Sequence, residues 1–127
     1  MRDFEKISFE QFKKDVRNDR ELYEKYELPF RGSVASAGYD LFLLEDLEIQ
    51  PGEVVKLPTG LKAHFENDEV LFLIVRSSTG FKYNIRLCNQ VGIVDSDYYN
   101  SDNEGHIIAK IVQTENSNPI CFEAGVG

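Results

Sequence analysis

Two aspartates, Asp95 and Asp97, stand two residues apart after the mostly apolar stretch 89–94, and Tyr98 follows them directly. The β-branched residues of this stretch favour an extended, half-buried strand, and Gly92 leaves room for another group to approach the backbone. Side chains two residues apart share one face of an extended strand, so we expect the two carboxylates to lie close together. Because like charges held together cost free energy, a cation or a polar function would offset the cost.

A solvated turn at the end of a strand is the alternative interpretation of Asp-Ser-Asp taken alone. An EF-hand calcium loop does not fit, because its twelfth position would be His106 and its sixth position has no glycine. The stretch therefore indicates chemistry only in combination with two other motifs.

A second motif, Arg76-Ser77-Ser78-Thr79-Gly80, comes directly after the apolar stretch 70–75. Hydroxyl groups and turn amides donate hydrogen bonds to phosphate, and a guanidinium pairs with a phosphate or with an acid such as Asp40. The motif is not a Walker loop, since it lacks the Gly-Lys-Ser/Thr ending. A polar turn without chemistry remains the alternative.

A third motif, Ala37-Gly38-Tyr39-Asp40-Leu41, places small residues and an aspartate at the start of a predicted strand. By itself it marks only that strand start.

The first element that must position these motifs is a single helix predicted over residues 8–26. Ser8 is a good N-cap, and Gln11 stands at the third helical position, where its side chain returns a bond to the cap. Ile7 and Phe12 occupy the positions of a hydrophobic staple. Pro29 sets the end, because the residue before a proline avoids helical geometry.

From residue 34 onwards the pattern changes to short extended pieces separated by turn residues. Strands at this spacing, without a second helix, indicate an all-β sandwich or jelly roll. The predicted strands are 39–43, 47–49, 53–57, 61–65, 70–75, 84–88, 91–94, 106–112 and 119–122.

The composition limits the classes of partner. A chain of 127 residues with a net charge of −8 argues against binding to nucleic acid or to an anionic membrane, so an anionic substrate needs a local positive group or a divalent cation. No apolar run approaches the ~18 residues of a membrane span.

Cys88 and Cys121 are predicted to be buried free thiols, which fits a cytoplasmic location. His64 and His106 lack ligand-spaced partners and are predicted to be structural or solvent-facing.

The three motifs, in this order and spacing, resemble motifs one, two and three of the trimeric dUTP diphosphatase (dUTPase) family. The resemblance covers residues 33–127. It implies a distorted jelly roll of the β-clip type over residues 31–127, after an N-terminal helical extension over 1–30. It also implies a homotrimer for the full-length protein and the hydrolysis of dUTP to dUMP and pyrophosphate with Mg²⁺.

The resemblance assigns roles at the reacting phosphate. Asp95 is the general base that takes a proton from the water attacking the α-phosphate. Ser77 and Ser78 match positions that contact phosphate. Asp40 either pairs with Arg76 or holds a magnesium-bound water, so no side chain is expected to bind Mg²⁺ directly; substrate phosphates and water would hold the ion.

The resemblance also assigns the base and sugar pocket. Asn89 and the backbone around Gly92 and Val94 match the groups that read the edge of uracil. Tyr98 packs against the deoxyribose and leaves no room for a 2′-hydroxyl.

Three departures from the family pattern stand out. Residues 99–105 replace the usual Arg-Gly-Glu after the tyrosine, and Asn84 stands where the family often has glycine. The chain ends at 123–127, which aligns with the start of motif four, so the later glutamine, a final strand and the glycine-rich motif five are missing. Gln113 lies in the preceding strand and is not that glutamine. We expect a truncated or incomplete sequence, with a naturally short homologue as the alternative.

Two other functions remain open from the residues. A dCTP deaminase-like enzyme shares the fold and an Arg-Ser-Ser element, but is expected to lack both Gly-Tyr-Asp and Asp-x-Asp-Tyr. A non-catalytic or truncated nucleotide-binding homologue on the same scaffold is the other.

Overall fold

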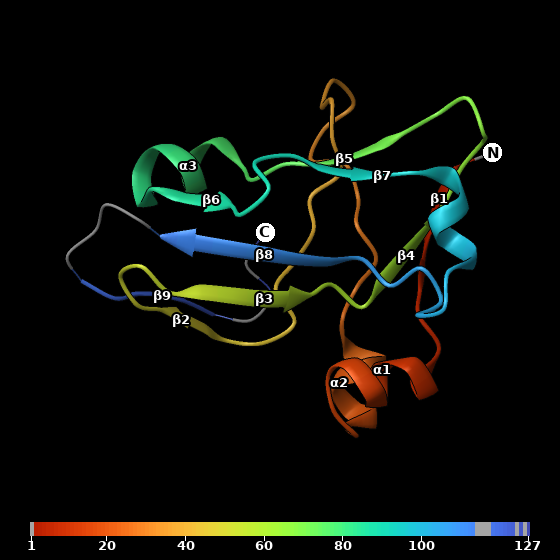
Figure 1. The fold of residues 1–127 in the computed structure, drawn as a ribbon, viewed down its shortest axis with the longest axis horizontal. Helices are drawn as coiled ribbons and strands as arrows, with labels where there is room; N and C mark the ends of the chain where they lie inside the picture. The colour runs from red at the N-terminus through yellow and green to blue at the C-terminus, as the bar shows by residue number, and fades with distance from the viewer. Residues whose placement is uncertain (1, 114–117, 124, 126) are drawn as a thin grey trace.

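Short antiparallel strands dominate the structure, a computed structural model that describes residues 2–113, 118–123, 125 and 127 (Figure 1). The all-β prediction is confirmed, with short helices added. In chain order the elements are β1 (Asp3–Lys6), α1 (Phe9–Asp15), α2 (Arg20–Lys25), β2 (Leu47–Ile49), β3 (Val54–Pro58), β4 (Leu61–His64), β5 (Leu71–Leu73), α3 (Ser77–Tyr83), β6 (Ile85–Leu87), β7 (Gly92–Val94), the 3₁₀ helix η1 (Ser96–Asn100), β8 (Ile108–Gln113) and β9 (Ile120–Phe122).

The described strands pair antiparallel in the orders β1-β4, β2-β9, β3-β8-β6 and β5-β7. Strand β8 is the centre of the three-stranded sheet. Strand β3 pairs with its residues 108–112, and β6 pairs only with its end, from Ile111 to Gln113. Val55, Ile111 and Leu87 lie opposite one another across the three strands. Since side chains alternate along a strand, this register directs one apolar face of the sheet into the core.

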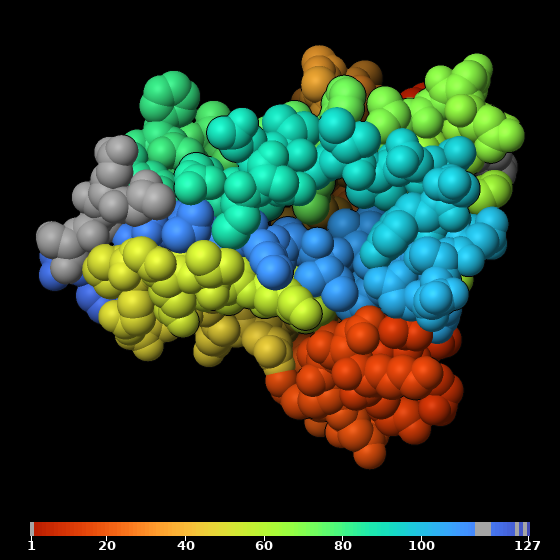
Figure 2. Space-filling view, viewed as in Figure 1, coloured from red at the N-terminus to blue at the C-terminus, as the bar shows by residue number. Residues whose placement is uncertain are grey.

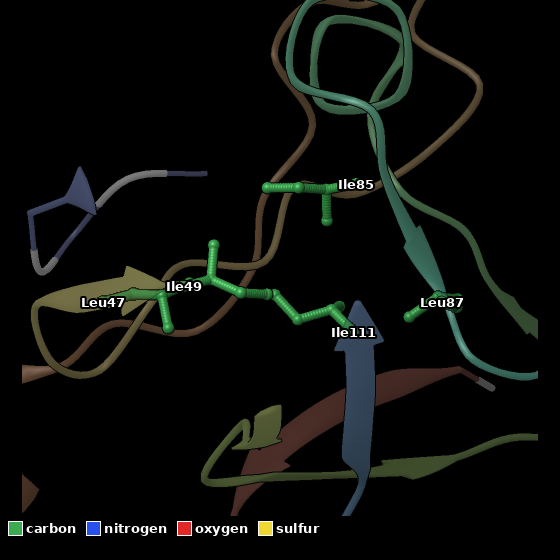
Figure 3. Close-up of a cluster of buried hydrophobic side chains, with 5 residues drawn as sticks. All are labelled: Leu47, Ile49, Ile85, Leu87 and Ile111. Atoms are coloured by element: carbon green, nitrogen blue, oxygen red, sulfur yellow. The ribbon is translucent and has the colours of Figure 1, made fainter. Parts of the chain in front are cut away.

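The main core joins that sheet to β2. Its buried side chains point toward one another in Figure 3, and none of these residues is more than 9% exposed. Burying one such leucine or isoleucine contributes about 1.5–3 kcal/mol. The cluster consists of Leu47, Ile49, Ile85, Leu87 and Ile111.

Two predictions around the motifs are wrong. Residues 39–43 form no strand; the backbone of Asp40 makes only an isolated bridge to Phe30. Residues 77–83 form helix α3 instead of a turn, and the helix ends at Asn84 with a φ of 54°. Glycine and asparagine are the residues that adopt this left-handed conformation at a helix end, so Asn84 performs the conformational task of the glycine usual in the family.

The prediction of a single N-terminal helix is also wrong, because residues 16–19 separate α1 from α2. Asp19 starts the second helix by accepting a hydrogen bond from the Leu22 N–H (3.0 Å). The break folds α2 back onto α1, so that the ring of Phe12 lies 5.3 Å from that of Tyr23 and 5.8 Å from that of Tyr26. Tertiary packing of aromatic rings therefore outweighs the local preference for one continuous helix.

The cap of α1 is partly as predicted. The Ser8 hydroxyl accepts from the Gln11 N–H, which confirms the N-cap. The predicted return bond between the Gln11 side chain and Ser8 is wrong. The backbone N–H of Ser8 donates to Glu104 (3.1 Å) instead, and the Gln11 side chain donates to Asp15 (2.9 Å). A residue far along the chain thus completes the cap.

The N-terminal region is bonded into the sheets. Strand β1, which the sequence did not predict, pairs with β4 from Asp3 opposite His64 to Lys6 opposite Leu61. The main-chain oxygen of Gly60 accepts from the Ile7 N–H (3.0 Å) and from the Tyr26 hydroxyl (2.7 Å). These bonds attach the predicted N-terminal extension to the strands, and the domain boundary near residue 31 stays a prediction.

Buried His106 connects α1 to the loop before β8. Its Nε2 accepts a hydrogen bond from the Gly60 N–H (2.9 Å), so its proton is on Nδ1, 2.6 Å from a carboxylate oxygen of Asp15. This agrees with the structural role predicted for His106. Burial raises the pKa of the Asp15 carboxyl, but hydrogen bonds from Gln11 and His106 outweigh it, and the pKa lies below its usual value.

Both cysteines are unpaired, as predicted, but they are exposed. The predicted burial is wrong because alternation sends each side chain outward: Cys121 lies between Ile120 and Phe122, which pack on the core, and Cys88 follows buried Leu87. Among the described residues, no helix is both long and apolar enough to cross a membrane.

Replacing Gly60 should reveal how tightly α2 is packed on the sheet. Gly60 has a φ of +75°, and a Cβ there would lie 2.6 Å from Cζ of Tyr26. Gly52 has a φ of +76° but nothing within 4 Å, so it is the matched control. Left-handed strain alone predicts a loss of about 1–2 kcal/mol for Gly52→Ala. Added overpacking predicts a loss of about 2–5 kcal/mol for Gly60→Ala in urea unfolding. Equal losses would contradict the packing of Tyr26.

The lowered pKa of Asp15 predicts how stability depends on pH. The charged carboxylate stabilises the fold above its unfolded pKa of about 4, and this contribution disappears as the pH falls through the lower folded value. Asp15→Asn should therefore lower the Tm at pH 7, and the gap from the wild type should narrow toward pH 3. Asp68→Asn, at an exposed turn residue, serves as the control. A gap that widens in acid would contradict the assignment.

Candidate functional site

A pocket of about 640 Å³ opens between β7 and β8. Strand β6 pairs with β8 as far as Leu87, and the last bond of this edge runs from the Cys88 N–H to the Lys110 oxygen (2.9 Å). The chain then turns, and β7 pairs with β5 instead. The free edge of β7 consequently faces the segment 108–110 of β8 across the pocket, and Figure 2 shows a hollow between these segments.

The residues of the predicted motif three come together around this pocket. The free edge of β7 supplies main-chain N–H and C=O groups that a flat polar ligand can bind. Lys110, Ser101 and residues 107–109 also line the pocket; no motif in the sequence marked them. The predicted residues on its wall are Asn89, Gly92, Val94, Asp95 and Tyr98, with Asp97 beside them.

Gly92 is required by its partner strand. It lies opposite Leu73 in the β5–β7 pair, and a Cβ on Gly92 would be 3.0 Å from that of Leu73. The predicted close approach to this glycine is therefore present, and the approaching group is a side chain of the protein itself.

Asp95 stands where β7 ends and η1 begins. Its main-chain oxygen accepts from the Tyr98 N–H (3.1 Å), and its exposed carboxylate makes no cap bond to η1. The predicted extended geometry is wrong for Asp97, since residues 96–100 form a 3₁₀ turn. Both carboxylates nevertheless line the pocket. An exposed carboxylate that makes no cap bond is available to accept a proton or to hold a cation.

Tyr98 forms a fixed wall. Its hydroxyl donates to the main-chain oxygen of His106 (2.6 Å) and accepts from the side-chain amide of Asn103 (2.9 Å). Its ring packs against a buried cluster that includes Phe65 and Ile107. The ring orientation is thus set at both ends before any ligand enters.

The other predicted site residues lie elsewhere. Asp40 and Arg76 line a second, open groove but form no ion pair within the described ranges, so their predicted pairing is not present in a single chain. Ser77 and Ser78 begin α3, which lies at the opposite end of Figure 1 from η1. One chain therefore carries two separate groups of candidate residues. Gln113 is buried in the core, where its amide donates to the Ile49 oxygen.

The pocket suits a planar heterocycle next to a polar reaction centre. Strand edges can read donor and acceptor groups, the aromatic wall can stack on an apolar ring, and Asp95 can activate water. Within the described residues, no three histidine, cysteine or carboxylate side chains gather as a metal cage.

Comparison with known proteins gives a consistent result. The family model described as dUTPase matches residues 24–117. A protein of Lactococcus lactis subsp. lactis named deoxyuridine 5′-triphosphate nucleotidohydrolase is 42% identical over 97 residues, which are 72% of this chain and 65% of that protein. A protein of the same name from Shewanella piezotolerans is 41% identical over 83 residues, which are 63% of this chain and 55% of the relative. This chain thus spans less than two thirds of these relatives.

Solved structures agree with the fold. A crystal structure of a dUTPase from Streptococcus mutans superposes with a TM-score of 0.73 and 40% identity, covering 97% of this chain and 87% of the other. The D95N mutant of a dUTPase from phage phi11 of S. aureus, a protein that coordinates a structural Mg(II) ion, superposes with a TM-score of 0.64. Its identity is 19%, over 92% of this chain and 62% of the other, so it supports the fold alone.

Proposed function

The chain belongs to the dUTPase family, and from this membership we propose that the protein is a dUTP diphosphatase, which hydrolyses dUTP to dUMP and pyrophosphate with Mg²⁺. One observation carries the proposal: Asn89, Gly92, Val94, Asp95 and Tyr98 meet around a single pocket. Family membership supplies the reaction, and the pocket supplies the side chains that fit it.

In this proposal the free edge of β7 reads uracil. Asn89 and the backbone of residues 92–94 would bind the acceptor–donor–acceptor pattern of the base edge. Cytosine presents a different pattern and would leave a buried polar group without a partner, a penalty of about 1–3 kcal/mol.

The sugar and the reacting phosphate would lie along the same wall. The Tyr98 ring, fixed by its bond to His106, would pack on the deoxyribose and exclude a 2′-hydroxyl. Asp95 would take the proton from the water that attacks the α-phosphate, a step worth ~10²–10⁴ in rate. Its carboxylate has no cap bond to break before it acts.

The phosphates would be held by a second copy of the chain. Arg76, Ser77 and Ser78 are not among the residues that line the pocket of their own chain, and the helix that the serines begin lies at the opposite end of Figure 1 from η1. We therefore propose a homotrimer in which they complete the pocket of a neighbour. Exposed apolar side chains on β5 and β7, Phe72 at 57% and Ile93 at 66%, provide surface for such a contact.

Magnesium fits this arrangement as a partner of the substrate. Mg²⁺ usually keeps several waters and binds through one or two carboxylates and substrate phosphates, so it needs no protein cage. When bound, it neutralises phosphate charge, which an acidic protein with a net charge of −8 needs. Asp40 would hold a magnesium-bound water, and no side chain would coordinate the ion directly. A cytoplasmic location accords with two unpaired cysteines.

Turnover assays of the intact protein separate the candidate functions. Pyrophosphate released from dUTP supports the proposal. Ammonia released from dCTP would identify a deaminase-like enzyme, and binding of dUTP without either product would identify a non-catalytic homologue.

Replacement of the proposed base tests the mechanism. Asp95→Asn should lower kcat by ~10²–10⁴ while the Kd for a non-hydrolysable dUTP analogue stays within about threefold, because the carboxamide keeps the shape of the side chain. Asp102→Asn makes the same charge change at an exposed site outside the pocket and should have little effect. Full turnover by Asp95→Asn would remove Asp95 from the base role.

Truncation of the aromatic wall tests sugar selection. Tyr98→Ala should raise kcat/KM for UTP relative to dUTP by roughly tenfold or more, since the ring no longer occupies the space of a 2′-hydroxyl. Discrimination against dCTP should change less, because β7 reads the base. Unchanged preference for deoxyribose would show that another group excludes the ribose.

A further inference from the structure

Three contacts join the N-terminal segment, defined here as residues 2–23, to the loop 99–106. The Tyr99 hydroxyl donates to Glu5 (2.7 Å), and the Ser8 N–H donates to Glu104 (3.1 Å). The third contact is the bond between Asp15 and His106. The N-terminal segment lies before residue 24, where the match to the family model begins. A segment outside the family match thus holds the loop that follows Tyr98.

This loop fixes the wall of the pocket. The main-chain oxygen of His106 accepts from the Tyr98 hydroxyl (2.6 Å) and from the side-chain amide of Asn103 (3.3 Å). The same side-chain amide also donates to the hydroxyl oxygen of Tyr98 (2.9 Å). The Tyr98 side chain is therefore attached to the backbone of residue 106.

The backbone of residue 106 is held in turn by its own side chain. The His106 ring is fully buried, and both nitrogens are bonded, Nε2 to the Gly60 N–H and Nδ1 to Asp15. A rotation of the ring would break both hydrogen bonds at once, one of them buried and the other partly buried. Asp15 is the one member of this chain of contacts that comes from α1, so α1 can act on the pocket through it.

We propose that Asp15 and His106 are positioning residues for Tyr98, through which the N-terminal segment sets the deoxyribose side of the nucleotide pocket. This role rests on the proposed function. Neither residue lines the pocket, so both act through the carbonyl group of residue 106 and the Tyr98 hydroxyl.

The kinetic test compares Asp15→Ala with Asp19→Ala in the intact protein. Asp19 caps α2 in the same segment, and its side chain bonds to Arg17 and Leu22, so this control loses local stability without touching His106. Asp15→Ala should raise the KM for dUTP roughly three- to tenfold, lower the preference for dUTP over UTP by a similar factor and leave kcat within about twofold. Asp19→Ala should leave all three values near those of the wild type.

Two further variants separate positioning from a loss of stability. Asp15→Asn keeps an oxygen that accepts from Nδ1–H and should restore KM and sugar preference to within about twofold of the wild type. Tyr98→Phe removes the hydroxyl at the other end of the chain of bonds. If both residues act on one path, the double variant Asp15→Ala/Tyr98→Phe should show no larger change in KM and sugar preference than the single variant with the larger effect. Effects that multiply would overturn the proposal.

Amide hydrogen exchange tests the same connection without a substrate. Asp15→Ala should speed exchange of the amides of residues 98–106 by tenfold or more, whereas Asp19→Ala should affect α2 alone. Unchanged exchange at 98–106 in Asp15→Ala would overturn the proposal, whatever the kinetics. If the wild type failed to hydrolyse dUTP while the exchange changed as expected, the proposed function would fail and the link between α1 and Tyr98 would stand.

Discussion

The arrangement of the candidate site depends on a constraint on β8: its two edges are paired over different lengths. Strand β3 follows it from Val112 to Ile108, but β6 leaves it after Leu87 because the chain turns and β7 pairs with β5 instead. The edge groups of β7 and β8 are then left facing one another across a pocket. Backbone polar groups must find partners. An unpaired strand edge lining a pocket is therefore a natural place for a polar ligand to bind.

The second feature is the degree to which the periphery supports this pocket. Residues 2–23 look like an appendage in the sequence, yet they contribute a strand to β4, a helix cap bonded to Glu104 and a carboxylate bonded to buried His106. A buried imidazole must have partners for both nitrogens, and here one partner is the backbone of Gly60 and the other is a helix. The burial of one ring thus couples three separate parts of the chain.

The third feature is the separation of the two groups of candidate residues. The carboxylate and the aromatic wall share a pocket, but the serines of the second motif begin α3, which lies at the opposite end of Figure 1 from η1, and the arginine lines a different groove. A triphosphate brings several negative charges to a protein that already has a net charge of −8. Lys110 lines the pocket, but so do Asp95 and Asp97, so the pocket has no surplus of positive side chains for a triphosphate. This charge balance supports both the proposed second copy and the proposed magnesium ion.

The sequence alone was sufficient to predict the all-β class, most strands to within two residues and the residues of the third motif that line the pocket, because these depend on local alternation and local spacing. It did not predict β1, the break in the N-terminal helix, helix α3 or the outward-facing cysteines. Two of these depend on residues distant in the chain: β1 pairs with β4, and the helix break lets the rings of Tyr23 and Tyr26 pack against Phe12. The cysteines face outward because of the side on which alternation places them, which is fixed only once the core has formed. The bond between Asp15 and His106 left no local signal at all, because 91 positions separate the two residues and only the folded chain brings them together.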